Sequence, residues 1–363
     1  MAKNTKQAGG GKRVVVVGAT GNVGTSVVQA LAEDPDVASV LGIARRVPDW
    51  TPPKAEWASA DIGQESGRAT LGGRFAGADA VINLAWLFQP THNPAVTWST
   101  NVLGGIAVFR AAAEAEVPAL IHASSVGAYS PGPKDRAVDE SWPTHGWPEA
   151  AYCREKSYLE RVLDDFERTH TGMRVVRMRP GFLFKEAAAS EQRRLFAGPL
   201  VPGRLVRPGL LPFVPDIPGL RFQVLHTDDA ADAFRRAVHR DVRGAFNLAA
   251  GPPVDAELLA GILHARTVRL PRRAARAAVS AAWGLRLVPA SPHLLGAALT
   301  LPLMDCARAH AELDWHPEHT AVDALREFLR GLRRGSGMHT PPLAARVRGG
   351  RAHELATGAG VRP

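Results

Sequence analysis

A tyrosine and a lysine, Tyr152 and Lys156, stand four residues apart in a segment, 151–169, whose apolar spacing predicts a helix. Residues at this spacing share one face of a helix. A phenol with a pKa of about 10 exchanges protons poorly at neutral pH, and a neighbouring ammonium group favours the phenolate and lowers that pKa. The pair could therefore carry a proton to or from a substrate oxygen, although the same spacing is common on exposed helices.

Two adjacent serines, Ser124 and Ser125, follow a short apolar run, 119–123, that predicts a strand. In a doubly wound parallel sheet, the carboxyl ends of the strands line the ligand crevice. A serine hydroxyl at this place could donate a hydrogen bond to a substrate oxygen. An isolated pair of serines serves equally well as a loop or helix cap.

Three glycines, Gly18, Gly21 and Gly24, directly follow the β-branched run 14–17 and open a helical pattern over 25–33. Glycines at such a turn permit a tight bend, close approach of the backbone to a pyrophosphate, and close packing of helix on strand. The phosphate would lie at the helix N-terminus. The spacing is one residue wider than the common fingerprint, but its place between strand and helix predicts a dinucleotide-binding turn. Its other members are Thr20, Asn22 and Val23.

Strand and helix patterns alternate along the first half of the chain, which favours an α/β fold with a doubly wound parallel sheet. The further segments in this half are strands over 37–44, 80–85 and 174–178 and a helix over 101–115. After Pro180 the pattern changes to a loop-rich stretch with many Pro and Gly residues. A strand and a helix then follow over 223–238, a last short strand over 245–249, and mainly helices over 255–330.

Charge and cysteine content bound the class of protein. The chain has 363 residues and a formal net charge of +9, and the excess lies entirely in residues 1–13 and 331–363. Both ends lack apolar periodicity, so we expect basic, disordered tails with no specific nucleic-acid partner. The two cysteines, Cys153 and Cys306, fit no disulfide framework or metal site and suit a cytoplasmic protein. No stretch resembles a secretory signal or a membrane span.

The order of the motifs, a glycine turn, then Ser124-Ser125, then Tyr152-x-x-x-Lys156, resembles the extended short-chain dehydrogenase/reductases, also called the NAD-dependent epimerase/dehydratase family. Further segments between residues 12 and 330 agree with that family's patterns. They are Asn83-Leu-Ala85, Asn101-Val-Leu-Gly104, Ser124-Ser-Val-Gly-Ala-Tyr129, Arg179-Pro-Gly181, His226-Thr-Asp-Asp-Ala230 and Phe246-Asn-Leu248.

The resemblance implies roles for individual residues. Tyr152 would be the general acid/base, and Lys156 would lower its pKa and hold the nicotinamide ribose. Counting back four residues from Tyr129 selects Ser125 as the catalytic hydroxyl, supported by Ser124. Asn101 is a weaker candidate, for which a structural role is as plausible.

The resemblance also implies a cofactor site. Ala85 would lie beside the cofactor, and Asp61 and Ile62 would face the adenine. NAD-preferring members carry an acid after the second strand, where this chain has Ala44 followed by Arg45 and Arg46. A guanidinium binds a 2′-phosphate well, so NADP is favoured over NAD, with two ordinary surface arginines as the alternative.

The implied architecture is a Rossmann-type domain with a smaller, mainly helical C-terminal substrate-binding region. We place the dinucleotide-binding domain at 12–180 plus about 223–240 and the substrate-binding region at 181–222 plus about 241–330. Residues 1–11 and 331–363 would be tails. Members of this family pair through helices that would here be near 101–115 and 151–167, which implies a possible homodimer.

The leading functional hypothesis is an NAD(P)-dependent oxidoreductase that transfers hydride between nicotinamide and a carbonyl or alcohol carbon. A nucleotide-sugar epimerase or dehydratase with tightly bound NAD is the first alternative, and a non-catalytic dinucleotide-binding or sensing protein is the second. The segment Met178-Arg-Pro-Gly-Phe-Leu-Phe184 lacks an Asn that nucleotide-sugar members often carry, which weakens the first alternative. The apolar residues of 185–222 and 255–305 either line a substrate pocket or pack against the sheet. They include Phe196, Phe213, Phe222 and Trp283.

Overall fold

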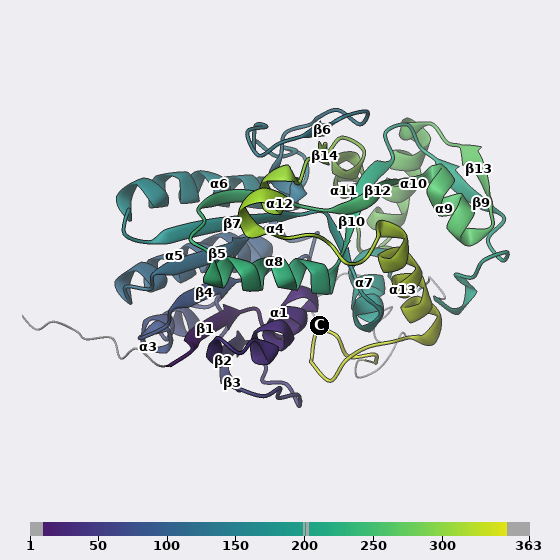
Figure 1. The fold of residues 1–363 in the computed structure, drawn as a ribbon. Coiled ribbons are helices and arrows are strands. Elements are labelled where there is room, and N and C mark those ends of the chain that lie inside the picture. Colours follow the sequence, from purple (N-terminus) through teal and green to yellow (C-terminus); the bar gives the residue numbers. More distant parts are fainter. Residues whose placement is uncertain (1–9, 199, 201–202, 347–363) are drawn as a thin grey trace, which may run out of the picture.

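A seven-stranded parallel sheet forms the centre of the molecule (Figure 1). The computed structural model describes residues 10–198, 200 and 203–346. The strand order is β11-β7-β5-β4-β1-β2-β3, which confirms the predicted doubly wound α/β class. The strands are β1 (Lys12–Val17), β2 (Val37–Ala44), β3 (Ala55–Ser59), β4 (Ala80–Asn83), β5 (Ala119–Ala123), β7 (Arg174–Pro180) and β11 (Gly244–Leu248).

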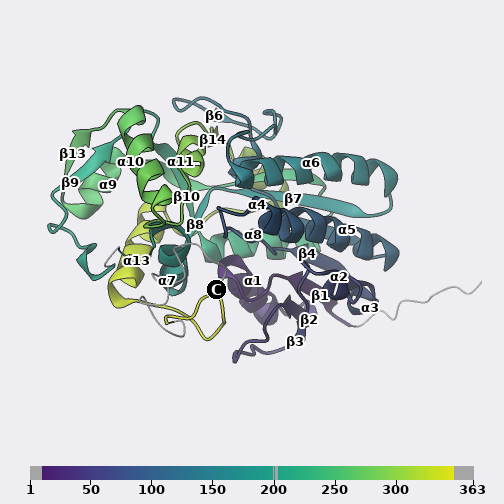
Figure 2. The same cartoon turned by 180° about the vertical axis from the view of Figure 1, so that it is seen from behind.

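The sheet is covered by helices on both faces, because its central strands are apolar on both sides. In β1, Val14 and Val16 belong to one core and Val15 and Val17 to the other, as the alternation of side chains along a strand requires. The first core is closed by α1 (Asn22–Glu33), α8 (Thr227–His239) and α12 (Ala307–Leu313). The second is closed by α3 (Leu71–Phe75), α5 (Gly104–Glu114) and α6 (Ala151–Thr169), which lie in front of the sheet in Figure 2. The short helices α2 (Glu65–Arg68) and α4 (Pro94–Trp98) and a π-helix (Ser99–Leu103) precede α5.

The remaining elements gather beyond the carboxyl edge of the sheet (Figures 1 and 2). A three-stranded sheet there consists of β8 (Phe182–Phe184), β10 (Arg221–His226) and β12 (Ala250–Asp255). Two strand pairs accompany it, β9 (Phe213–Asp216) with β13 (Arg266–Arg269) and β6 (Ala137–Val138) with β14 (Leu303–Met304). The helices of this region are α7 (Ala189–Gln192), α9 (Ala256–Leu263), α10 (Arg272–Gly284), α11 (Pro292–Ala298) and α13 (Ala321–Arg334). No helix in the described part of the chain is long and apolar enough to span a membrane.

The strands near the predicted domain boundaries at 223 and 241 belong to different sheets. β10 pairs with β8 and β12 in the smaller sheet, whereas β11 pairs with β7 and forms the edge of the main sheet. The helix between these two strands, α8, packs on α1 in the dinucleotide-binding half. The apolar pattern identified both strands but carries no information on which sheet each one joins.

The predicted disordered tail from residue 331 is wrong over the residues that the structure describes. α13 runs through Arg334, where Arg330 and Arg334 both pair with Glu186. Residues 336–346, which we call the C-terminal strap, then return to the sheet edge, with Thr340 and Leu343 buried. The rest of that predicted tail, 347–363, and residues 1–9 lie outside the described residues. The sequence did not predict this segment because it contains few apolar residues and is held by only a few buried side chains.

Candidate functional site

The predicted site residues lie at one edge of the main sheet. Gly18 follows β1, Arg45 follows β2, Asp61 lies two residues after β3, Ala85 two after β4, and Ser125 two after β5. These strands are parallel neighbours, so their carboxyl ends meet along the same crevice. The fold therefore brings five separate segments together there.

Glycine stands at the three positions of the turn for different physical reasons. Gly18 has φ +84°, and a Cβ there would lie 2.6 Å from the Ala85 backbone nitrogen. A Cβ on Gly24 would lie 2.3 Å from the carbonyl oxygen of Gly18, so close packing of α1 on the turn excludes any side chain. At Gly21 the nearest atom would be 3.6 Å away, so the polypeptide itself does not require glycine at this position.

The N-terminus of α1 is suited to bind an anion. Gly21 is the N-cap, no side chain caps the helix, and its first turn contains no acid. Its first backbone N–H groups, from Asn22 and Val23 onward, have no partner within the helix, and their dipoles favour a negative charge. The Asn22 side chain is already engaged, since it donates to the Leu183 carbonyl and accepts from the Thr227 hydroxyl.

The far end of the crevice carries the residues predicted to face adenine and ribose. Asp61 accepts a hydrogen bond from the Gly63 N–H at 3.0 Å, and Ile62 is buried against α5 at Gly104. Ala44 is buried at the end of β2, Arg45 is half-buried and Arg46 is exposed. No carboxylate follows β2 at this position.

Ser125 and Tyr152 both lie beside Gly127. The Ser125 oxygen accepts from the Gly127 N–H at 2.9 Å. A Cβ on Gly127 would lie 2.5 Å from the Tyr152 ring and 3.4 Å from the Ser125 oxygen, so the glycine lets the ring approach the serine. Burial raises the pKa of Tyr152 above its ordinary value, and the nearby Ser125 side chain lowers it in part.

Lys156 lies one helical turn after Tyr152 and is 4% exposed. Its Nζ donates to the Ala123 carbonyl at 2.6 Å and lies 3.5 Å from the ring centroid of Trp86 and 6.0 Å from that of Tyr152. Burial lowers the pKa of Lys156 to about 7, against the opposing charges of Glu160 and Glu155. The role of Lys156 in lowering the Tyr152 pKa stays a prediction, and the largest influence on that pKa in this structure is burial of the phenol, which raises it.

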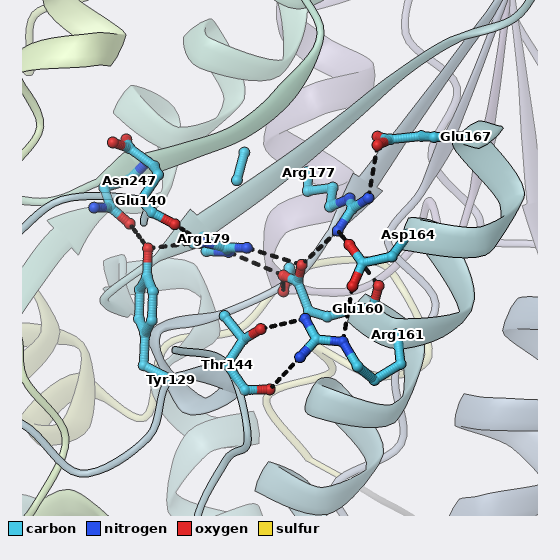
Figure 3. Close-up of polar contacts among 12 residues, drawn as sticks. Tyr129, Glu140, Thr144, Glu160, Arg161, Asp164, Glu167, Arg177, Arg179 and Asn247 are labelled. Atoms are coloured by element: carbon cyan, nitrogen blue, oxygen red, sulfur yellow. Dashed lines mark hydrogen bonds and ion pairs between the residues drawn. The ribbon is translucent and has the colours of Figure 1, made fainter. Parts of the chain in front are cut away.

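A buried charge network, whose charged members Figure 3 shows, is hydrogen-bonded to Ser124. Glu160, on α6, accepts hydrogen bonds from the Ser124 hydroxyl and from two nitrogens of Arg179, and it also pairs with Arg177. These contacts lower the pKa of Glu160 to about 2. Tyr129 belongs to the same network, since its hydroxyl donates to Asn247 at 2.6 Å and accepts from Arg179. Tyr129 is thus a structural residue, and burial raises its pKa to about 12.

Three aromatic residues, which we call the aromatic wall, pack around Tyr152. It consists of Trp86 and Phe88 from the segment after β4 and Phe196 from a π-helix (Arg193–Ala197). Phe88 stacks on Tyr152 with ring centroids 5.2 Å apart, Trp86 meets Tyr152 edge-on at 5.5 Å, and Phe196 packs edge-on against Phe88. The sequence analysis named Phe196 as a possible pocket residue, whereas Trp86 and Phe88, the first and third residues after Ala85, belong to none of its motifs.

Asn101 has a structural role that positions this wall. Its side-chain oxygen accepts from the Leu87 N–H at 2.7 Å, and its amide donates to the Leu87 carbonyl and to Glu155. Leu87, which lies between Trp86 and Phe88, is therefore held at both its backbone N–H and its backbone C=O.

The family model that matches the chain covers both the glycine turn and the serine and tyrosine segments. It is the NAD dependent epimerase/dehydratase family, and the match spans residues 14–249. The chain belongs to this family. It is accordingly a nicotinamide-dependent enzyme of the extended short-chain dehydrogenase/reductase type, as the order of its motifs predicted.

Similar proteins show the range of the family. A 4-hydroxy-2-methyl-3-oxo-4-farnesyl-3,4-dihydroquinoline-1-oxide ketoreductase from Stigmatella aurantiaca is 28% identical over 47% of this chain, which spans half of that enzyme's length. An uncharacterized protein of Mycobacterium tuberculosis is 25% identical over 97% of this chain and 92% of its own. Among solved structures, UDP-glucose 4-epimerase from Thermotoga maritima has a TM-score of 0.67 at 18% identity, covering 89% of this chain and 99% of that one. A dTDP-glucose 4,6-dehydratase from Streptomyces venezuelae has a TM-score of 0.65 at 19% identity, covering 92% and 100%. These two likenesses show the fold.

The residues present fit the family's dinucleotide. Gly21 leaves room at the helix N-terminus where a side chain is not otherwise excluded. At the other end of the crevice, the Trp86 indole N–H is buried and has no hydrogen-bond partner in the described part of the chain. A buried donor without a partner is costly, so this group beside Lys156 suits a polar ligand atom.

Proposed function

We propose that this family member is an oxidoreductase that interconverts a carbonyl compound and its alcohol, with Tyr152, Ser125 and Lys156 as the catalytic residues. The observation that carries the proposal is the placement of Ser125, at the carboxyl end of β5, beside the Tyr152 ring at Gly127, one helical turn from buried Lys156. The bound nicotinamide cofactor supplies or accepts the hydride. Gly18, Thr20, Gly21, Asn22, Val23 and Gly24 would hold its pyrophosphate, Asp61 and Ile62 its adenine, and Ala85 and Lys156 its nicotinamide end.

Tyr152 has a proton to give in carbonyl reduction. A phenol is protonated at neutral pH, and burial of Tyr152 keeps it so. Tyr152 then donates its proton to the carbonyl oxygen as negative charge develops there. The Ser125 hydroxyl donates to the same oxygen and orients it.

The aromatic wall supports an apolar substrate body next to the reacting carbonyl. Phe88 and Phe196 present rings that carry no hydrogen-bonding groups, and Phe196 is 38% exposed. The segment Met178–Phe184 lacks the Asn that nucleotide-sugar members often carry. The relative named as a ketoreductase of a farnesylated dihydroquinoline oxide agrees with a ketone of this kind.

The end of β2 supports NADP as the preferred dinucleotide. With Ala44 in place of an acid, nothing at this position repels a 2′-phosphate, and Arg45 and Arg46 supply positive charge. The family's NAD dependence sets the cofactor class, and the two arginines select within it.

The test uses a panel of apolar ketones with NADPH or NADH and the variant Tyr152→Phe. This variant keeps the ring but loses the transferable proton, so turnover should fall at least about 100-fold with dinucleotide affinity nearly unchanged. Tyr158→Phe is the matched control, because Tyr158 lies on the same helix and is 45% exposed. Full activity of Tyr152→Phe would disprove the assignment.

An epimerase or dehydratase remains the second candidate, because the family includes both activities in its name. In that case the cofactor is regenerated within each turnover and need not leave. Denaturing the purified protein and identifying any released dinucleotide separates the two. Stoichiometric NAD favours the epimerase type, and an empty site that prefers NADPH favours the reductase.

A further inference from the structure

The C-terminal strap crosses from the substrate-binding region to the glycine turn. It begins after Gly335, which ends α13 in a left-handed conformation. The Ser336 hydroxyl bonds to Glu186 and its carbonyl accepts from the Ser190 N–H. In both views the segment after α13 runs back to the N-terminal end of α1 (Figures 1 and 2).

The strap has a defined internal structure. The Met338 N–H donates to the Leu343 carbonyl, and Arg194 donates to the carbonyl of Pro342 at 2.8 Å. A Cβ on Gly337 would lie 2.3 Å from the Ala345 nitrogen, so the strap closes tightly on itself. Leu343 is fully buried. These contacts fix the position of Thr340 between the two ends of the loop.

Thr340 reaches the turn at one specific atom. Its hydroxyl donates to the Thr20 carbonyl at 2.9 Å, and both residues are at least 95% buried. The next group along, the Gly21 N–H, bonds to the Gly18 carbonyl at 3.3 Å. Because the C=O and N–H of a planar trans peptide point in opposite directions, the peptide between Thr20 and Gly21 is held from both sides.

This peptide is the one that leads into α1. Its orientation determines where Gly21 and the first N–H groups of the helix point, and these groups would receive the pyrophosphate. A bond that fixes them before binding lowers the cost of ordering the site.

We infer that Thr340 is a positioning residue of the dinucleotide site and that the C-terminal strap is part of that site. The inference rests on the proposed use of the glycine turn for the dinucleotide. Loss of the Thr340 hydroxyl leaves the two halves joined, because buried Lys185 also bonds to Thr25 and Ser26 of α1. The effect should therefore fall on cofactor affinity and not on folding.

The experiment compares three variants of the full chain by NADPH and NADH titration, steady-state kinetics and thermal unfolding. Thr340→Val removes the hydroxyl at constant shape and should raise the dinucleotide Kd and KM about three- to tenfold, with kcat at saturating cofactor little changed. Thr340→Ser keeps the hydroxyl and should restore affinity. Thr320→Val is the matched control, because Thr320 loses an equivalent hydroxyl at the N-cap of α13 and should lower Tm without changing the Kd.

The outcomes are distinct. A raised Kd in Thr340→Val, rescued by Thr340→Ser and absent in Thr320→Val, supports the inference. An unchanged Kd in Thr340→Val overturns it while leaving the proposed function intact. A wild-type protein that binds neither dinucleotide overturns both. If Thr340→Val fails to fold, Thr340→Ala serves in its place, since it also removes the hydroxyl. A folded Thr340→Ala variant with a raised Kd supports the inference, and one with an unchanged Kd overturns it.

Discussion

The Ser124 hydroxyl donates a 2.5 Å hydrogen bond to Glu160, a carboxylate that lies on α6 one turn beyond Lys156. Glu160 also neutralises Arg177 and Arg179, all three being buried. The helix that carries the proposed acid and the strand end that carries the serines are thereby joined through one side chain. Removal of one partner from such a network leaves buried charges uncompensated.

Glu160→Gln should therefore destabilise the fold by about 3–5 kcal/mol in urea unfolding at pH 7. Glu167→Gln, which removes a partly exposed partner of Arg177 in the same network, should cost less than about 1 kcal/mol. The pH dependence has a definite sign. The folded pKa of Glu160, about 2, lies below its ordinary value, so its contribution is complete above the ordinary carboxyl range and is lost as the pH falls towards 2. Equal destabilisation by both variants would contradict this account.

Lys156 should make the ligand-free protein more stable at alkaline pH. Its folded pKa is about 7 against 10.5 ordinarily, so the unfolded chain binds more protons between these values and stability rises with pH across that window. Lys156→Met removes this contribution. Its stability relative to wild type should be most favourable at and below pH 7 and decline by about 3 kcal/mol between pH 7 and pH 9.5. Lys134 and Lys185, whose pKa values burial lowers to about 8, are present in both proteins and cancel. The measurement is urea unfolding of both proteins from pH 7 to pH 9.5. If the difference in unfolding free energy between Lys156→Met and wild type stayed constant with pH, Lys156 would not be the group that causes the pH dependence.

Local patterns predicted the elements of the site well. The run Val14–Val17 and the glycines after it specified strand, turn and helix, because short-range sterics decide each of them. The predicted helix over 151–169 matches α6 and places Tyr152 and Lys156 on one face. The homodimer through α5 and α6 stays a prediction.

Contacts between distant segments could not be predicted in the same way. Nothing in Phe246 or Val224 shows that their strands join different sheets. Thr340 lies 320 residues from its partner in the turn. The direction of the Tyr152 pKa depends on how deeply the aromatic wall buries the ring, which only the assembled fold determines.

The glycine turn makes a prediction that separates folding from binding. Gly24→Ala places a Cβ 2.3 Å from the Gly18 carbonyl oxygen, so it should lower stability by several kcal/mol or prevent folding. Gly21→Ala meets no protein atom closer than 3.6 Å and should fold with nearly wild-type Tm. Its methyl group would nevertheless occupy space at the helix N-terminus, so NADPH affinity should fall at least about tenfold. Thermal unfolding and dinucleotide titration of both variants check this, and a Gly21→Ala variant that binds normally would place the pyrophosphate elsewhere.

The end of β2 provides the last prediction, on cofactor choice. If Arg45 and Arg46 bind a 2′-phosphate, replacing both with alanine should weaken NADPH binding about tenfold or more, because a charge-assisted hydrogen bond contributes about 1.5–3 kcal/mol. NADH has no such phosphate, so its Kd should stay within about twofold and serves as the internal control. The single variants then separate half-buried Arg45 from exposed Arg46, and the larger loss is expected for Arg45 because a less hydrated contact is stronger. Equal losses for NADPH and NADH would indicate general damage to the crevice, whereas no loss for either would make both arginines ordinary surface residues and leave NAD as the cofactor.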